Sequence, residues 1–128
     1  MKQFLTFLIL GRTYAVDLAR VESVLEGTTL KTAYGGPIHA IGAVRIGKES
    51  VQVIDAAWIL GYGVTSPGPA SAVVILSSFA AGRRRLVGIL IDEMQEAILL
   101  DDTVSNGGDR IMHELAVDTL FSADVFPA

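Results

Sequence analysis

A short pattern that occurs twice along the chain constrains the fold more than any other feature. Each copy has an apolar run, a Gly-Arg pair, a second apolar run and an aspartate that ends it. The first copy contains Gly11-Arg12 and Asp17, and the second contains Gly82-Arg83 and Asp92. A Gly-containing turn between two β-rich runs is typical of a β-hairpin. The repeat therefore predicts two similar β-barrel lobes in one chain.

Further apolar runs indicate the remaining elements. We expect strands at Phe4–Leu10, Tyr14–Val16, Leu30–Tyr34, Ala43–Ile46, Val51–Ile54, Ala72–Leu76, Leu86–Ile91, Ala97–Leu100 and Arg110–Val117. Apolar residues from Leu18 to Leu25 recur at helical spacing, which predicts a short helix or turn closed by Gly27. Asp55 is expected to cap a second short helix. In this helix we expect Trp58 to lie in the core, with an interface anchor as the alternative.

One stretch rich in Pro, Gly and Ser, Thr65–Ser71, lies near the middle of the chain. The length of 128 residues supports one domain. We therefore expect a single domain over 1–128, with subdomain 1 at about 12–64 and subdomain 2 at about 65–128. The N-terminal strand at 3–11 is expected to be shared between them.

Composition and charge exclude several classes of protein. The chain is 51% apolar and 19% charged, which excludes intrinsic disorder. A net charge of −4 argues against nucleic-acid binding. Without cysteine there are no disulfides, thiolate metal sites or cysteine nucleophiles. The uncharged run Ala56–Gly82 is long enough to cross a membrane, but Gly, Pro and Ser interrupt it, so no membrane insertion is expected.

The residues that usually carry chemistry form no catalytic or metal-binding pattern. His39 and His113 are not spaced as metal ligands, and Asp101-Asp102 is expected to be a solvated turn. We predict no catalytic residue, no metal and no cofactor. The one basic run, Arg83–Arg85, has two open interpretations: it keeps a sheet edge soluble, or it contacts an acidic partner.

Taken in order, these segments resemble the CheW-like family of chemotaxis coupling adaptors over roughly residues 3–100. The matching segments are Phe4–Phe7, Leu10-Gly11, Tyr14–Asp17, Val21-Glu22, Ile41–Val44, Val51–Asp55, Leu60-Gly61, Val73–Leu76, Gly82-Arg83, Val87-Gly88 and Ile91-Asp92. The resemblance implies a mainly β fold of two intertwined SH3-like five-stranded β-barrels with short helices. It also implies a non-enzymatic adaptor in the cytoplasm, clustered at membrane-associated receptor arrays.

The same resemblance implies the partners and their contact residues. Members of the family bridge the regulatory domain of a CheA-type histidine kinase and the cytoplasmic tip of a chemoreceptor, a methyl-accepting protein. A groove between the barrels takes the receptor helices. Carried over by position, the receptor-binding residues are Val21, Gly42, Arg45, Gly47, Lys48, Val87 and Gly88. The kinase-binding residues are Ser23, Ile38 and Ile41.

Two departures from the family pattern predict an accessory variant with one partner surface altered. Gly47 stands where the family has the arginine of an Asn-Leu-Arg-Gly turn. Lys48 lies one residue away and is expected on the opposite face, whereas Arg45 keeps the original face.

The second departure is length, because only 28 residues follow Leu100. We therefore expect the second barrel to lack a strand and to expose a sheet edge, which favours pairing with a partner or a homodimer. The alternatives are a small-ligand-binding β-barrel and a structural dimeric module. The first of these requires a closed pocket with convergent polar groups.

Overall fold

Strands dominate the part of the chain that the computed structural model describes, which is residues 2–27, 31–32, 40–63, 68–80, 82–100 and 113–121. The strands are β1 (Lys2–Ile9), β2 (Arg12–Asp17), β3 (Val21–Glu26), β4 (Lys31–Thr32), β5 (Ala40–Ile46), β6 (Glu49–Asp55), β7 (Ala72–Ala80), β8 (Arg83–Ile91), β9 (Glu93–Leu100) and β10 (His113–Glu114). The helical elements are the 3-10 turns η1 (Leu18–Arg20) and η3 (Val117–Phe121) and the helix α1 (Ala56–Ile59).

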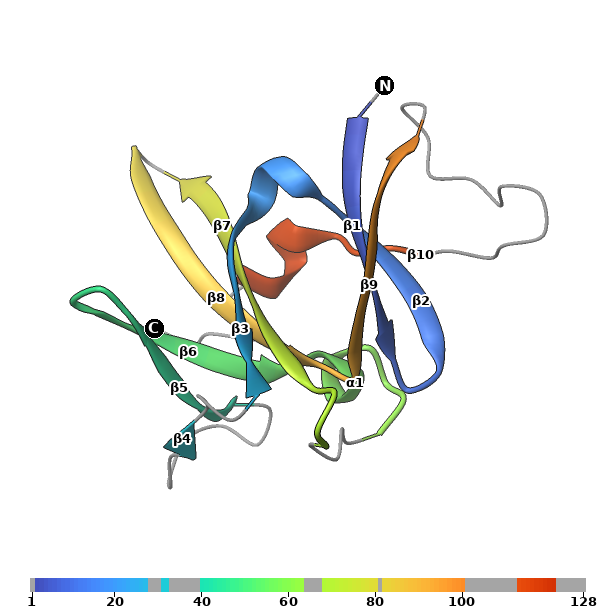
Figure 1. Cartoon of the computed structure of the whole chain (residues 1–128). Coiled ribbons are helices and arrows are strands. Elements are labelled where there is room, and N and C mark those ends of the chain that lie inside the picture. The colour runs from blue at the N-terminus through green and yellow to red at the C-terminus, as the bar shows by residue number, and fades with distance from the viewer. Residues whose placement is uncertain are drawn as a thin grey trace.

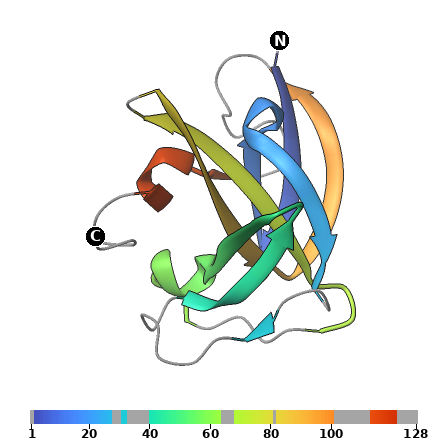
Figure 2. The ribbon, with the colours of Figure 1, turned by 90° about the vertical axis from the view of Figure 1, so that its left-hand side faces the viewer.

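The strands form two sheets (Figures 1 and 2). One has the order β10-β2-β1-β9, and the other has the order β3-β7-β8-β6-β5-β4 and curves into a half-barrel. All neighbours are antiparallel except the pairs β10–β2 and β6–β8. The predicted mainly β class is confirmed. Among the described residues, one sheet has four strands and the other has six, whereas the family resemblance predicted five strands in each barrel.

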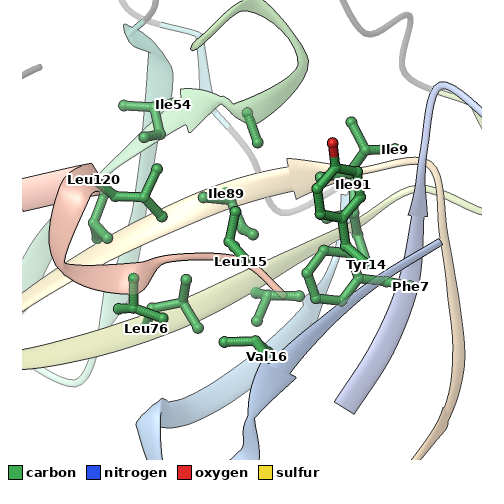
Figure 3. Close-up of a cluster of buried hydrophobic side chains, with 14 of the residues drawn as sticks. Phe7, Ile9, Tyr14, Val16, Ile54, Leu76, Ile89, Ile91, Leu115 and Leu120 are labelled. Carbon is green, nitrogen blue, oxygen red and sulfur yellow. The ribbon is translucent and has the colours of Figure 1, made fainter. Parts of the chain in front are cut away.

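The β7–β8 hairpin lies at the centre and contributes to two apolar cores. Val74 and Leu76 of β7 pack into the main core with β1, β2, β8 and η3, which Figure 3 shows. Val73 and Ile75 point the other way, into the half-barrel core with β5, β6 and β8. Both faces of β7 are therefore buried, as expected for a strand between two lobes. The division into subdomains near residue 64 stays a prediction.

The turn glycines and strand-ending aspartates of the repeated pattern have distinct local roles. Gly11 and Gly82 take the left-handed backbone conformation, at φ 77° and 74°, in the turns of the two hairpins. Asp17 Oδ1 accepts from the Ala19 amide at 3.0 Å, which is the predicted local cap. Asp92 Oδ2 instead accepts from the Leu10 amide at 2.7 Å, so it ties the end of β8 to the β1–β2 turn.

The helix predicted from Leu18 to Leu25 is wrong beyond η1. The chain continues as strand β3, with a bulge between Val21 and Ser23 in its pairing with β7. Because a bulge shifts the faces by one residue, Val21 packs against the main core and Leu25 against the half-barrel core. This loss of strict alternation produced an apparent helical period.

The core position predicted for Trp58 is also wrong, because its residue surface is 40% exposed. In the four-residue helix α1, Ala56 and Ala57 face the core instead, and Asp55 caps the helix as predicted. The last strand is shorter than expected, since β10 covers only His113–Glu114 among the described residues.

Candidate docking groove between the two sheets

A groove of about 430 Å³ lies where β3, β9 and the segment leading into β7 meet. Within the described residues, β3 is a terminal strand of the six-stranded sheet and β9 is a terminal strand of the other (Figure 1). The groove lining includes residues of both strands, so the groove lies between the two sheets. Its walls consist of Val24, Leu25, Glu26, Gly27, Gly68, Pro69, Ala70, Ser71, Ala72 and Met94.

Two segments of the groove lining are held together by a close backbone contact between Gly27 and Ser71. The Gly27 amide donates to the Ser71 carbonyl at 3.0 Å. A Cβ on Gly27 would lie 2.9 Å from that same oxygen, so a side chain there would separate β3 from the segment before β7. The Gly68 amide donates to Ser71 Oγ at 2.8 Å, which closes the turn over residues 68–71.

The chemistry of the lining suits an apolar partner. Val24, Leu25, Pro69 and Met94 provide apolar walls, and a methionine adapts its shape to different partners. Glu26 is the one ionisable side chain of the lining. Among the residues that the structure describes, no three of His, Asp and Glu gather closely enough to hold a metal ion. The groove therefore resembles a site for the apolar face of a helix more than a reaction site.

Four of the residues predicted to bind a receptor lie within the packed strands. Val21 is partly buried against the main core, and Gly42 is buried in β5. Val87 is fully buried in β8, and a Cβ on Gly88 would come 2.9 Å from Val53 Cγ2. None of these residues lines the groove, and Val87 and Gly88 offer no side-chain surface. Their role as receptor contacts stays a prediction.

The other three predicted receptor residues gather at the β5–β6 turn. Arg45 and Lys48 are exposed, and Gly47 between them takes a φ of 61°. Arg45 lies opposite Ser50 in the β5–β6 pairing. The β5–β6 turn therefore carries two exposed cations, Arg45 and Lys48, next to Gly47, which occupies the position of the family's arginine. None of these three residues belongs to the groove lining.

The residues predicted to bind a kinase are spread over two strands. Ser23 is half-buried on β3, opposite Ile75 and next to the groove residue Val24. Ile41 is half-buried on β5, where it packs against the half-barrel core. Ile38 lies outside the described residues. The structure therefore brings Ser23, but not Ile41, to the strand that forms the groove.

Comparison with known proteins gives the family. A model of the CheW-like domain matches residues 3–111, most of the chain. The chain belongs to the CheW-like domain family. The scaffolding protein TtCheW from Thermoanaerobacter tengcongensis has a similar structure, with a TM-score of 0.67 and 21% sequence identity. The match covers 79% of this chain but 66% of TtCheW, slightly less than two thirds of its length. The comparison with curated proteins finds no match.

Family membership identifies this CheW-like chain as a relative of chemotaxis scaffolds that are not catalysts. None of the helices in the described part of the chain reaches the length and apolar character of a membrane span.

The groove residues were not predicted as site residues from the sequence. Val24 was assigned to an expected helix, and Pro69 and Ala70 to a linker. No sequence pattern identified Met94 as a groove residue. It reaches the rest of the groove lining only because β9 pairs with β1. The one sequence signal that points toward the groove is the small-residue segment before β7, whose glycine and serine allow the close approach to Gly27.

A polar clamp holds η3 against the rest of this CheW-like domain. Arg20 Nη2 lies 2.6 Å from Asp118 Oδ1, and Ser78 Oγ donates to the same oxygen at 2.9 Å. The hydrogen bond from Arg20, followed by that from Ser78, lowers the pKa of Asp118 below its ordinary value. Arg20 also donates from Nε to the Ser77 carbonyl at 2.8 Å. The clamp therefore joins η1, β7 and η3.

A second cluster of polar aromatics closes the opposite side of the main core. Tyr14 lies against His113, with ring centroids 5.4 Å apart, and the Arg12 guanidinium lies 3.9 Å above the Tyr62 ring. Burial, and then a hydrogen bond with Tyr62, raise the pKa of Tyr14. Tyr14 therefore stays neutral at physiological pH, and its ring contact with His113 joins β2 to β10.

Proposed function

We propose that this protein is a non-enzymatic chemosensory adaptor that couples the regulatory domain of a CheA-type histidine kinase to the cytoplasmic tip of a chemoreceptor. Membership of the CheW-like domain family supports an adaptor. The observation that carries the proposal is the apolar groove at the junction of the two sheets. Its place of action would be the cytoplasm, at clusters of receptors.

The groove supports docking of a receptor helix. Its apolar walls come from three separate segments, which lets an inserted helix contact both sheets. Val24 is 42% exposed, so this part of the apolar groove wall faces solvent and is accessible to a partner. Burial of apolar area is the main source of affinity in this mode of recognition. The groove therefore needs no cofactor to work.

We further propose that the variant is an accessory adaptor with an altered receptor surface. Gly47 at the β5–β6 turn carries no side chain, so the forked guanidinium of the family pattern is missing there. Arg45 and Lys48 would then form a second part of the receptor surface, separate from the groove, and the buried positions Gly42, Val87 and Gly88 would act only through the packing of β5 and β8. Ser23 and Ile41 would contact the kinase domain. A homodimer through a sheet edge remains the alternative, because β3 and β9 are terminal strands among the described residues.

The test is a pair of titrations with the protein, one against a receptor-tip fragment and one against the kinase regulatory domain from the same organism. Val24→Glu places a charge in the groove wall and is expected to weaken receptor binding about tenfold, with kinase binding unchanged. Leu99→Glu is the matched control, because Leu99 is 60% exposed on β9 outside the groove lining and receives the same charge.

Three outcomes decide the proposal. Binding of neither partner at high micromolar concentration would refute the adaptor function. If both glutamate substitutions weakened receptor binding equally, the groove would not be part of the receptor-binding site. Sedimentation that detects a dimer of the wild-type protein, with no affinity for either partner, would favour the structural module.

A further inference from the structure

The turn of the β1–β2 hairpin contains a leucine in an unusual backbone conformation. Leu10 has a φ of 46° and is the one non-glycine residue with a positive φ among the residues that the structure describes. With Gly11 at φ 77°, both residues of this two-residue turn lie in the left-handed region, where asparagine and glycine are preferred and leucine is strained. The Leu10 side chain is also 37% exposed. The local conformation would therefore favour a different residue at this position.

An exposed arginine and a partly exposed tyrosine lie beside this turn. The Arg12 guanidinium lies 3.9 Å from the centre of the Tyr62 ring, and Tyr62 is 37% exposed. Leu10 Cδ1 lies 3.9 Å from the position that a Cβ would take on Gly63, so the leucine reaches the residue next to Tyr62. Leu10, Arg12 and Tyr62, here called the turn patch, thus form one surface with an apolar part and a cation.

The turn patch is held in place before any partner binds. Asp92 Oδ2 accepts from the Leu10 amide at 2.7 Å, which fixes the turn. The Tyr62 amide donates to the Ala57 carbonyl at 2.9 Å, and a hydrogen bond joins the side chains of Tyr62 and Tyr14. A surface that is already ordered loses less entropy when a partner binds.

The charge of Arg12 is not neutralised by an ion pair. In the described part of the chain, no carboxylate lies within ion-pair distance of Arg12, in contrast to the paired Arg20 and Arg84. Stacking on Tyr62 uses the flat face of the guanidinium, so the N–H groups at its edge can still donate to a carboxylate. A second copy of the chain docked through the same surface would bring two Arg12 side chains together, which like-charge repulsion disfavours.

We propose that the turn patch is a docking surface for a partner protein segment that presents a carboxylate between apolar side chains. The carboxylate accepts hydrogen bonds from the Arg12 guanidinium, and the apolar side chains cover Leu10 and the Tyr62 ring. Arginine and tyrosine are among the residue types that dominate binding energy at protein interfaces. None of the three residues lines the docking groove, so this surface does not depend on the proposed receptor site.

The test is an NMR titration of the isotope-labelled protein with a capped Leu-Glu-Leu peptide and with the matched Leu-Gln-Leu peptide. We expect shifts of the Leu10 amide and Arg12 side-chain resonances, and an affinity about fivefold higher for the glutamate peptide at low salt. Arg12→Gln should abolish the difference between the two peptides. Leu10→Asn should weaken the binding of both peptides by the same factor, about fivefold.

The Leu10→Asn variant also separates docking from folding. Asparagine adopts the left-handed turn conformation more readily than leucine, so the melting temperature of the variant should equal or exceed that of the wild type. Arg83→Gln and Leu99→Ser are the matched controls, because they remove an exposed cation and an exposed apolar side chain that lie away from this turn. Neither control should change the affinity for the peptides.

Four results would overturn the proposal. An absence of shifts at the turn patch with millimolar peptide, or equal affinity for the two peptides, would exclude a carboxylate site at Arg12. A lower melting temperature of Leu10→Asn, with unchanged affinity for the peptides, would assign the leucine to the fold. Self-association of the wild type that both Leu10→Asn and Arg12→Gln abolish would make the occupant a second copy of the chain.

Discussion

Replacement of Gly88 by alanine tests whether this glycine serves packing or partner binding. Gly88 is at once a predicted receptor residue and a buried position of β8 in the half-barrel. A Cβ there would lie 2.9 Å from Val53 Cγ2, 3.1 Å from Val73 Cγ1 and 3.2 Å from Ile75 Cδ1. All three neighbours are fully buried side chains of the half-barrel core, so they have little room to move away.

The magnitude follows from two opposing effects. Overpacking of a core costs about 1–3 kcal/mol. Alanine in place of glycine within a strand recovers about 0.5–1 kcal/mol of backbone entropy. We therefore expect Gly88→Ala to lower the free energy of unfolding by about 1–2 kcal/mol. In a domain of 128 residues, 1 kcal/mol corresponds to about 4 °C, so the melting temperature should fall by about 4–8 °C.

The assay is thermal and urea unfolding followed by circular dichroism. Gly68→Ala is the matched control, because a Cβ at Gly68 meets nothing within 4 Å, so only the entropy gain of about 0.4–1 kcal/mol should remain and the variant should not be destabilised. The double variant Gly88→Ala/Val53→Ala removes the nearest methyl. The two single losses should therefore sum to more than the loss measured in the double variant.

A wild-type melting temperature for Gly88→Ala would refute the packing argument. If that variant also lost receptor binding, the glycine would serve close approach of the partner, as the family resemblance implies. A drop in stability with unchanged affinity, measured where both proteins are folded, would assign Gly88 to the core alone.

Two further substitutions test polar contacts of the fold. Thr6 is fully buried and its Oγ1 donates to the Glu96 carbonyl at 2.6 Å, beside the bulge in the β1–β9 pairing. Thr6→Val should lower the free energy of unfolding by about 1–2 kcal/mol, whereas Thr6→Ser keeps the donor; equal losses in urea unfolding would contradict this. Asp118→Asn removes a carboxylate whose pKa is lowered by Arg20 and then Ser78. Its stabilising effect is present above the pKa of the unfolded chain and is lost as pH falls through the lowered pKa. The wild type should therefore exceed Asp118→Asn in stability at pH 7, with a difference that shrinks below about pH 4; a difference independent of pH would exclude this charge effect.

Elements whose signals are local could be predicted from the sequence. The hairpins at Gly11 and Gly82 formed where the glycine-containing turns separate apolar runs, and Asp55 caps α1. These features depend on a few neighbouring residues, so one sequence is sufficient. The family resemblance then predicted the mainly β fold, because the order of many weak segments is specific even where each segment is not.

The features that were missed depend on contacts between distant segments. β3 has apolar residues directed into both cores, and its bulge removes the alternation by which a strand is recognised. The groove joins residues 24–27, 68–72 and Met94, which no sequence spacing links. Trp58 was placed in the core because it is apolar, but a four-residue helix has room to bury only its two alanines.

The position of the β7–β8 hairpin explains why exposed apolar residues are found at its two ends. Because β7 is buried on both faces along most of its length, the hairpin fixes the two cores relative to each other and leaves little apolar surface along its middle. At one end, the segment before Ala72 meets Gly27 and Met94 and forms the groove. At the other end, Phe79 and Arg84 extend past β3 and stay exposed. A partner helix in the proposed docking groove would thus contact the end of the hairpin that lies next to Gly27 and Met94.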